Sequence, residues 1–490
     1  MLIWCVINSE EITYNMYVNK KNMQKAIIFY FIFFVDFILF LLNCFEQLEQ
    51  VLVFTGGFAI STLVFTEILL YKTANKINFF LLFIGVAFAF EFGQSMSVFI
   101  GGYNSMNPIW FLNINSGYFS GNEIWKAFFF MHMLIMSFVV AYIMFYKENE
   151  QVSNKEVIVI PQKQFKKECQ IGYLLLIISI VPTFYMLKKD ISTIRVYGYG
   201  ATLQAASGGI EKIFIILSEF FPISVIWLLI YEKRKQGKLT ILLLTAIYMF
   251  LQLAGGSRIQ VFRFAITLFL IYALLYRMIN KRNIIFFLLA GLVGVFILSL
   301  ISSIRTMIYV SSNLSELIQK AALELWENNF IVETLRELGN TQIINTLVYK
   351  ECQENIDYAY GTSYLKMLFS VLPNLSGGGH PSSIDVDSVF SPLYSKTTGL
   401  GSSFIAEAYW NFGFLSIVFC FVLGKIFACI DIGLNEVCGL NAQNNKTKAY
   451  LYFYLCFLLI FWVRSSCNGF GRSMFFAVIP IIMNKIIVKR

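Results

Sequence analysis

Residues 124–146 read IWKAFFFMHMLIMSFVVAYIMFY, a run in which only Lys126 and His132 can carry a charge. A helix rises about 1.5 Å per residue, so a helix of this length is long enough to cross a bilayer core of roughly 30 Å. The run therefore predicts a transmembrane helix.

Similar apolar runs recur along the whole chain. Of its 490 residues, 58% are hydrophobic, 17% are aromatic and only 14% are charged, and the mean hydropathy is +0.67. These values exclude a water-soluble protein. We predict an all-α, polytopic transmembrane bundle of about twelve helices with one large, partly helical loop. The expected helices cover residues 26–42, 50–71, 77–100, 124–146, 171–187, 212–231, 239–254, 259–276, 284–304, 402–430, 449–463 and 473–488.

The distribution of lysine and arginine predicts how the bundle is oriented. The two terminal segments and every second connection together hold 22 of these residues, whereas the opposite short connections hold 6. Positively charged residues favour the cytoplasmic side of a membrane. Both termini should therefore be cytoplasmic, and the long loop should face outward. We divide the chain into membrane helices (1–304), the outward loop (305–401) and a second set of membrane helices (402–490).

The formal net charge of +9 does not indicate a nucleic-acid partner. A nucleic-acid binder gathers its basic residues on one soluble face, whereas here they are dispersed between apolar runs. The nine cysteines show neither a CxxC motif nor a cysteine and histidine spacing typical of metal sites. Neither a disulfide framework nor a zinc site is expected, and we predict no cofactor.

Arginine dominates the positive charge on the predicted outward side. The residues are Arg195, Arg258, Arg305, Arg464 and Arg472, with Arg263 one turn inside a predicted helix. An arginine at the centre of a membrane helix costs about 2.5–3.5 kcal/mol on insertion scales, so such residues face the bundle interior and have partners. Guanidinium groups match phosphate oxygens well. The set predicts a site for a diphosphate, as on a polyprenyl-linked sugar. The alternative is pairing with Glu407, Glu219, Glu91 or lipid headgroups.

Two glycine-containing turns carry three of these arginines. GGSR (255–258) would allow close approach of the backbone, so that its N–H groups and Arg258 could face one anion. RSSCNGFGR (464–472) is bracketed by Arg464 and Arg472. The first motif also suits a tight helical hairpin without any ligand.

The two histidines suggest different roles. His380, in the outward stretch GGGHPSS, is a candidate general base for a sugar hydroxyl, or a surface residue without a role. His132 lies in the middle of a predicted helix and should form a hydrogen bond to another helix. Asp385 and Asp387 form a DVD motif of the kind that holds divalent metals in many glycosyltransferases. Because arginines can neutralise a diphosphate leaving group, no metal is predicted.

A further carboxylate occurs in GLGSSFIAEAYWNFGFLS (399–416), near the start of a predicted helix. Helical spacing places Ser403, Glu407 and Asn411 on one face. Glu407 should either pair with an arginine or orient a hydroxyl as a catalytic residue. The residues expected to bind the molecule that carries the reacting sugar hydroxyl, the acceptor, are Ser403, Asn411 and Tyr409.

Taken in order, several of these segments resemble the Wzy-type O-antigen or capsule repeat-unit polymerases. They are the hairpin closing on GGSR, the loop segment YGTSYLKMLFSVLPN (360–374), GSSFIAEAYWNFGFLS (401–416) and the last helix pair joined by RSSCNGFGR. The resemblance covers chiefly residues 250–475.

The resemblance implies a glycosyltransferase at the periplasmic face of the bacterial inner membrane, with a fold like that of O-antigen ligases and other glycosyltransferases of the C type. It would transfer the growing glycan from undecaprenyl diphosphate to an incoming lipid-linked repeat unit. Arg305 and His380 would then be catalytic, Arg258 would bind the diphosphate, and a chain-length regulator protein and membrane lipid would be partners. The alternatives are a lipid-linked oligosaccharide flippase or polysaccharide transporter, which has less use for a long outward loop, and an O-antigen ligase.

Overall fold

The structure is a computed structural model that describes residues 20–45, 47–103, 118–147, 162–197, 209–275, 294, 296, 300, 315, 319–323, 329–371, 384–394, 401–438 and 446–488. Within these residues the regular elements are all helical. They are α3 (Lys20–Leu41), α4 (Leu48–Ala74), α5 (Phe79–Glu91), α6 (Gly93–Gly101), α8 (Gly121–Phe145), α9 (Gln162–Tyr197), α11 (Gly209–Ser218), α12 (Phe220–Tyr231), α13 (Lys235–Ala254), α14 (Arg258–Leu270), η2 (Ile271–Leu275), α17 (Phe330–Leu338), α18 (Thr341–Glu354), α19 (Thr362–Phe369), α20 (Val386–Tyr394), α21 (Phe404–Phe412), η4 (Gly413–Leu415), α22 (Ser416–Val437), α23 (Lys446–Trp462), η5 (Cys467–Gly469) and α24 (Phe470–Val488).

Among the described residues, 9 helical stretches are long and apolar enough to cross a membrane, and each coincides with a predicted run. The run predicted at 77–100 is different, because α5 and α6 meet at a bend of 71°. The run at 449–463 corresponds to α23, whose 17 residues span about 26 Å. The run predicted at 284–304 lies outside the continuously described ranges. The prediction of an all-α polytopic membrane protein is confirmed.

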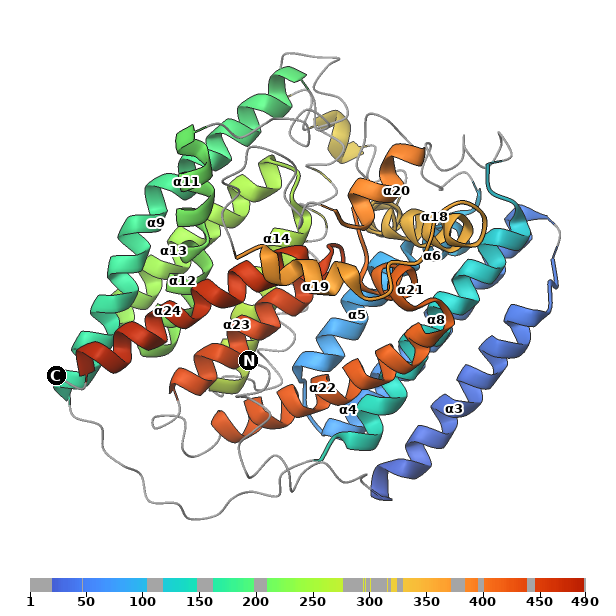
Figure 1. Cartoon of the computed structure of the whole chain (residues 1–490), viewed down its shortest axis with the longest axis horizontal. Coiled ribbons are helices and arrows are strands. Elements are labelled where there is room, and N and C mark those ends of the chain that lie inside the picture. The colour runs from blue at the N-terminus through green and yellow to red at the C-terminus, as the bar shows by residue number, and fades with distance from the viewer. Residues whose placement is uncertain are drawn as a thin grey trace.

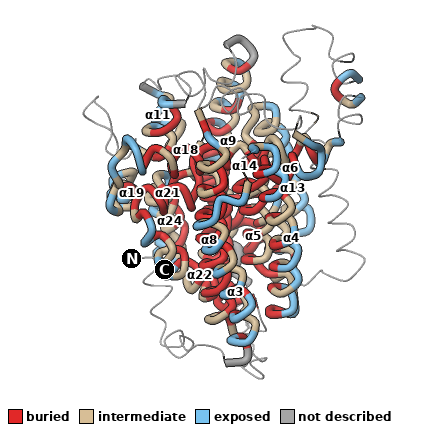
Figure 2. Tube along the Cα trace, turned by 90° about the vertical axis from the view of Figure 1, so that its right-hand side faces the viewer, coloured by how far each residue is buried: buried red, intermediate tan, exposed pale blue. Residues whose placement is uncertain are grey.

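The helices form two groups that lie side by side (Figure 1). In one group α3, α4 and α22 pack around α8, and in the other α11, α12 and α24 pack against α9. Helix α23 contacts α22 in the first group and α12, α14 and α24 in the second, so it joins them. Figure 2 shows buried residues along the middle of the molecule, where α8 lies, and exposed residues on outer helices such as α13.

Small residues allow the helices of the first group to approach closely. A Cβ atom added at Gly424 of α22 would lie 2.2 Å from the carbonyl oxygen of Phe138 in α8. One added at Gly56 of α4 would lie 2.0 Å from the carbonyl oxygen of Ser95 in α6. Packing through small residues is the usual means of helix association in a membrane, where the hydrophobic effect contributes little.

A buried polar cluster fixes α3 to the same group. His132 of α8 contacts Asp36 of α3 at 2.7 Å through Nδ1 and Thr62 of α4 at 3.0 Å through Nε2. Both His132 and Asp36 are fully buried. The expectation that His132 bonds to another helix is confirmed, and its partner is an acidic residue.

Contacts near helix ends place the start of α3, the start of α9 and the end of α24 at one end of the bundle. Asn22 donates to the carbonyl of Tyr146 at 2.9 Å, and Lys167 donates to that of Ile487 at 3.1 Å. These ends belong to the lysine-rich connections that the charge distribution assigns to one side.

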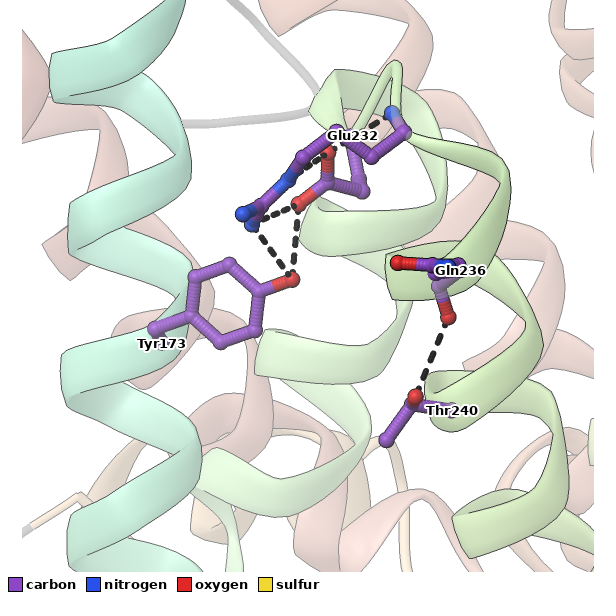
Figure 3. A network of polar contacts seen from close by, with 5 residues as sticks. Tyr173, Glu232, Gln236 and Thr240 are labelled. Atoms are coloured by element: carbon purple, nitrogen blue, oxygen red, sulfur yellow. Dashed lines mark hydrogen bonds and ion pairs between the residues drawn. The ribbon is translucent and has the colours of Figure 1, made fainter.

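The connection between α12 and α13 lies at that end and is held by one acidic side chain (Figure 3). Glu232 accepts hydrogen bonds from Arg234 Nη2 at 2.9 Å and from the Tyr173 hydroxyl of α9 at 2.7 Å. The hydrogen bonds from Arg234 contribute most to lowering the pKa of Glu232 to about 2. The carboxylate therefore ties α9 to the start of α13.

At the opposite end, helices of the long loop lie directly on the membrane helices. Helix α17 packs on α6, and α18 packs on α8 and α21. The loop segment 360–374 contains α19, which packs on η5 and α24. Tyr364 stacks on Phe412 in α21, whereas Leu365 and Leu368 are exposed.

Candidate functional site

Glu407 lies in a closed polar environment that we call the Glu407 cluster, with Ser363, Trp462, Cys467 and Asn411. Ser403 caps α21 by accepting from the Ala406 amide, so Glu407 falls in the first turn. Its Oε2 accepts from Trp462 Nε1 at 3.0 Å and from the Cys467 amide at 2.9 Å. Its Oε1 accepts from the Ser363 hydroxyl at 2.9 Å and from Cys467 Sγ at 3.1 Å. Only 1% of the residue is exposed.

These contacts bear on the two reasons expected for Glu407, pairing with an arginine or orienting a hydroxyl. Among the described residues no arginine pairs with it, and a side-chain hydroxyl, that of Ser363, donates to it. Because the Cys467 amide belongs to the turn between Arg464 and Arg472, the carboxylate fixes the turn that carries both arginines. The arrangement indicates a positioning role, since both oxygens are already occupied by donors.

The three expected acceptor-binding residues are also enclosed by protein. Ser403 donates to Glu91, at 2.8 Å to its nearer oxygen. Asn411 donates to the Ser363 hydroxyl at 2.7 Å. The ring of Tyr409 stacks on Tyr349 with centroids 5.4 Å apart. All three are fully buried, so they support the helix α21 rather than an open surface.

The GGSR turn does not present its backbone to an anion. The amides of Gly255, Gly256 and Ser257 all donate to carbonyl oxygens at the end of α13. Gly256 adopts φ 74, a conformation that suits glycine and that a tight reversal requires. Arg258 starts α14, is 8% exposed and forms an ion pair with Glu337. The turn is therefore a helix-ending motif, and only Arg258 remains a candidate for ligand binding.

Two other arginines meet around Glu219, and we call Glu219, Arg263, Arg472 and Ser473 the Glu219 cluster. Arg472 Nη2 donates to Glu219 Oε1 at 3.0 Å, and the Ser473 hydroxyl donates to Oε2 at 3.0 Å. Arg263 reaches the same carboxylate electrostatically. Its guanidinium also lies over the rings of Phe457 and Phe461, at 4.2 and 4.8 Å from their centroids. Arg472 thus pairs with the carboxylate of Glu219, which is the alternative to diphosphate binding that the sequence left open.

The donors of this cluster are not all used. The Nε atoms of Arg263 and Arg472 are both buried, and neither has a hydrogen-bond partner. Leaving such a group without a partner costs about 1–3 kcal/mol, and more when it is charged. A single carboxylate offers too few acceptors for two guanidinium groups and a hydroxyl. The two unpaired Nε donors are therefore candidates for binding an anion.

The two aspartates of the DVD motif hold the backbone near Arg464. Asp385 accepts from the Ser466 hydroxyl at 3.0 Å, and Asp387 accepts from the Gly401 amide at 2.8 Å. The guanidinium of Arg464 lies 5.8 Å from the centroid of the Phe90 ring. In the described part of the chain, no group of three His, Cys, Asp or Glu residues is placed to hold a metal ion.

Three expected site residues cannot be placed. Arg305 and His380 lie outside the described residues, and Arg195 is in α9, where its side chain is not among those described. Their assigned roles remain predictions.

The structure adds residues that the sequence did not single out as part of a site. Ser363 and Cys467 complete the Glu407 cluster, and Ser473 belongs to the Glu219 cluster. Glu219 was expected only as an alternative partner for arginine. The sequence signal for the helix break at Glu219 was a charged residue inside an apolar run, followed three residues later by Pro222.

The model of the family described as O-antigen polysaccharide polymerase Wzy matches residues 25–490. No curated protein and no solved structure matches the chain. The family is one of polymerases, as the sequence motifs predicted, and not of flippases. The chain, a multi-pass membrane protein, belongs to the O-antigen polysaccharide polymerase Wzy family.

Proposed function

We propose that this polymerase is a glycosyltransferase of the bacterial inner membrane that works at the periplasmic face, with both termini in the cytoplasm. The growing glycan, held on undecaprenyl diphosphate, is transferred from its reducing end to a sugar hydroxyl of an incoming lipid-linked repeat unit. The family match supports O-antigen polymerisation in general. The uneven distribution of lysine and arginine supports the orientation.

The observation that carries the diphosphate assignment is the Glu219 cluster. Arg472 pairs with Glu219 there, Arg263 lies within electrostatic range of the same carboxylate, and each arginine has a buried Nε donor without a partner. Guanidinium groups bind phosphate oxygens through charge-assisted hydrogen bonds. We assign Arg263 and Arg472 to the donor diphosphate. Arg195, Arg258 and Arg464 are proposed to extend the positive surface along the lipid-linked chain.

The chemical step needs an acceptor, a base and a stabilised leaving group. The acceptor oxygen attacks the anomeric carbon, and the bond from this carbon to the diphosphate breaks with its electron pair on the phosphate oxygen. Arg263, Arg472 and Arg305 stabilise the charge that develops there. His380 takes the proton of the acceptor hydroxyl. Glu407 acts at a distance by fixing the turn between Arg464 and Arg472.

The proposal is tested by deleting the gene in its host and restoring it with variants. Arg263→Ala and Arg472→Ala should give surface glycan with single repeats, because a weaker grip on the diphosphate leaves the first transfer incomplete. Lys235→Ala is the matched control, since Lys235 is exposed at the opposite end of the bundle, and it should restore full-length chains. Full-length chains in both arginine variants, at normal protein levels, would exclude this site.

A further inference from the structure

Glu219 lies at a break in a membrane-spanning stretch. The stretch Ile210–Tyr231 is divided into α11 and α12, and Glu219 is the residue between them. Its amide bonds to the carbonyl of Ile216, three residues back, so the regular α-helical pattern is interrupted. Non-helical backbone inside a membrane occurs where protein or a ligand site surrounds it.

The position of the Glu219 carboxylate is fixed from two sides. The hydroxyl of Ser473 holds one oxygen at 3.0 Å, and Arg472 holds the other at 3.0 Å. Arg263 makes no direct contact with this carboxylate but lies within electrostatic range of it, so two positive charges and one negative charge belong to the cluster. A negative charge next to two anion-binding arginines weakens the binding of any anion there. Its presence calls for a reason other than tight binding.

The reason we find lies in the chemistry of the proposed reaction. The donor is a diphosphate esterified at both ends, by the lipid and by the glycan. After transfer, the lipid diphosphate is esterified at one end only, and the phosphate oxygen that was bonded to the sugar is freed and ionises with a pKa of about 6. At neutral pH the product therefore carries close to one negative charge more than the donor. A fixed carboxylate repels the product more strongly than the donor.

We propose that Glu219 is a specificity-determining residue that discriminates between the two diphosphates by charge, favouring release of the spent lipid diphosphate over loss of the donor. This inference rests on the diphosphate site of the proposed function. Glu219 touches no reacting bond, and it acts through the net charge of the Glu219 cluster.

The test is a binding measurement on the full-length protein in lipid nanodiscs with two soluble probes. Farnesyl diphosphate represents the product, and its terminal methyl ester represents the doubly esterified donor. Glu219→Gln keeps the size of the side chain and removes its charge. It should strengthen binding of farnesyl diphosphate about tenfold, equivalent to about 1.4 kcal/mol. Binding of the methyl ester should strengthen by a clearly smaller factor, about threefold.

Three further variants make the outcome unambiguous. Ser473→Ala removes a hydrogen bond to Glu219 without changing the charge of the cluster. The ratio of the two affinities should therefore stay near that of the wild type. This variant is the control for a general disturbance of the cluster. Equal strengthening of both probes by Glu219→Gln, or none, would overturn the inference while leaving the diphosphate site in place. Wild-type binding of both probes by Arg263→Ala and Arg472→Ala would overturn the site and the inference together.

Discussion

Removing the Glu407 carboxylate should open the turn between Arg464 and Arg472. In Glu407→Ala the Trp462 indole and the Cys467 amide lose their acceptor while remaining buried. Each buried donor without a partner costs about 1–3 kcal/mol, so the two together weaken the turn by about 4 kcal/mol. In Glu407→Gln the amide oxygen can still accept from both N–H groups. The hydrogen bonds then lose only the contribution of the negative charge on the acceptor, which lowers the stability of the turn by about 1 kcal/mol for each bond and about 2 kcal/mol in total.

Cys467 reports on the opening directly, because only 4% of the residue is exposed and a thiol reagent can reach it only when the turn opens. Labelling of this cysteine, followed by mass spectrometry, measures the population of the open state. At tenfold per 1.4 kcal/mol, labelling should be roughly 30-fold faster in Glu407→Gln and roughly 700-fold faster in Glu407→Ala. Surface glycan chains should shorten in the same order.

The same experiment contains its controls. Cys44 is exposed and should react equally in every variant, whereas the buried Cys420 and Cys456 should stay protected unless the whole bundle unfolds. Glu67→Gln alters a carboxylate whose Oε1 is buried without a hydrogen-bond partner, and it should leave Cys467 protected. Wild-type labelling of Cys467 in Glu407→Ala would refute the view that this carboxylate holds the turn.

Three other changes test separate parts of the structure. Gly471→Ala would place a Cβ atom 2.3 Å from the carbonyl oxygen of Met367, so α19 must move away from α24 at a cost of about 1–3 kcal/mol, seen as a lower unfolding temperature and shorter glycan. Asp36→Ala leaves the buried His132 Nδ1 without its partner and should destabilise the protein by about 1–3 kcal/mol; an unchanged unfolding temperature would show that the pair does not hold α3. The pKa of Glu232 is lowered to about 2, so its stabilising contribution is complete above the ordinary value near 4.5 and is lost as the pH falls toward 2. The difference in unfolding temperature between the wild type and Glu232→Gln should therefore be constant from pH 7 to 5.5 and shrink below pH 4.5, and a difference that does not change with pH would contradict this.

The sequence was informative about the fold because each membrane helix can be recognised from its own run of apolar residues. A run such as 124–146 needs no knowledge of its neighbours to be assigned, and the structure places α8 there. Breaks within runs were harder to predict. Gly93 begins α6 at the 71° bend between α5 and α6, and a Cβ atom added there would lie 2.5 Å from the carbonyl oxygen of Leu335 in α17. That contact joins residues more than two hundred positions apart, and no local pattern contains it.

The partners of the candidate site residues could be predicted only in part from the sequence. Glu407 and the arginines were recognised because charged residues near apolar runs are costly and need partners. Which partner each one finds depends on tertiary packing. Arg258 meets Glu337 of the loop, Arg472 meets Glu219, and Glu407 meets neutral donors. Helical spacing gave the correct face for Glu407 but no information about the turn that lies opposite.

The packing of α22 has a consequence for how the protein is made. Asp431, near its end, accepts the amides of Phe79 and Phe80 at 3.1 and 3.0 Å and so caps the start of α5. The two partners are 352 residues apart, and a ribosome adding about 5–20 residues per second needs roughly 20–70 s to cover that interval. During this time α3, α4, α5 and α8 are in the membrane, but α22 has not yet been synthesised and cannot pack against them. Factors that protect incompletely assembled helices should therefore be needed until late in the synthesis of this chain. A chain stalled before residue 431 should be inserted in the membrane but sensitive to proteolysis.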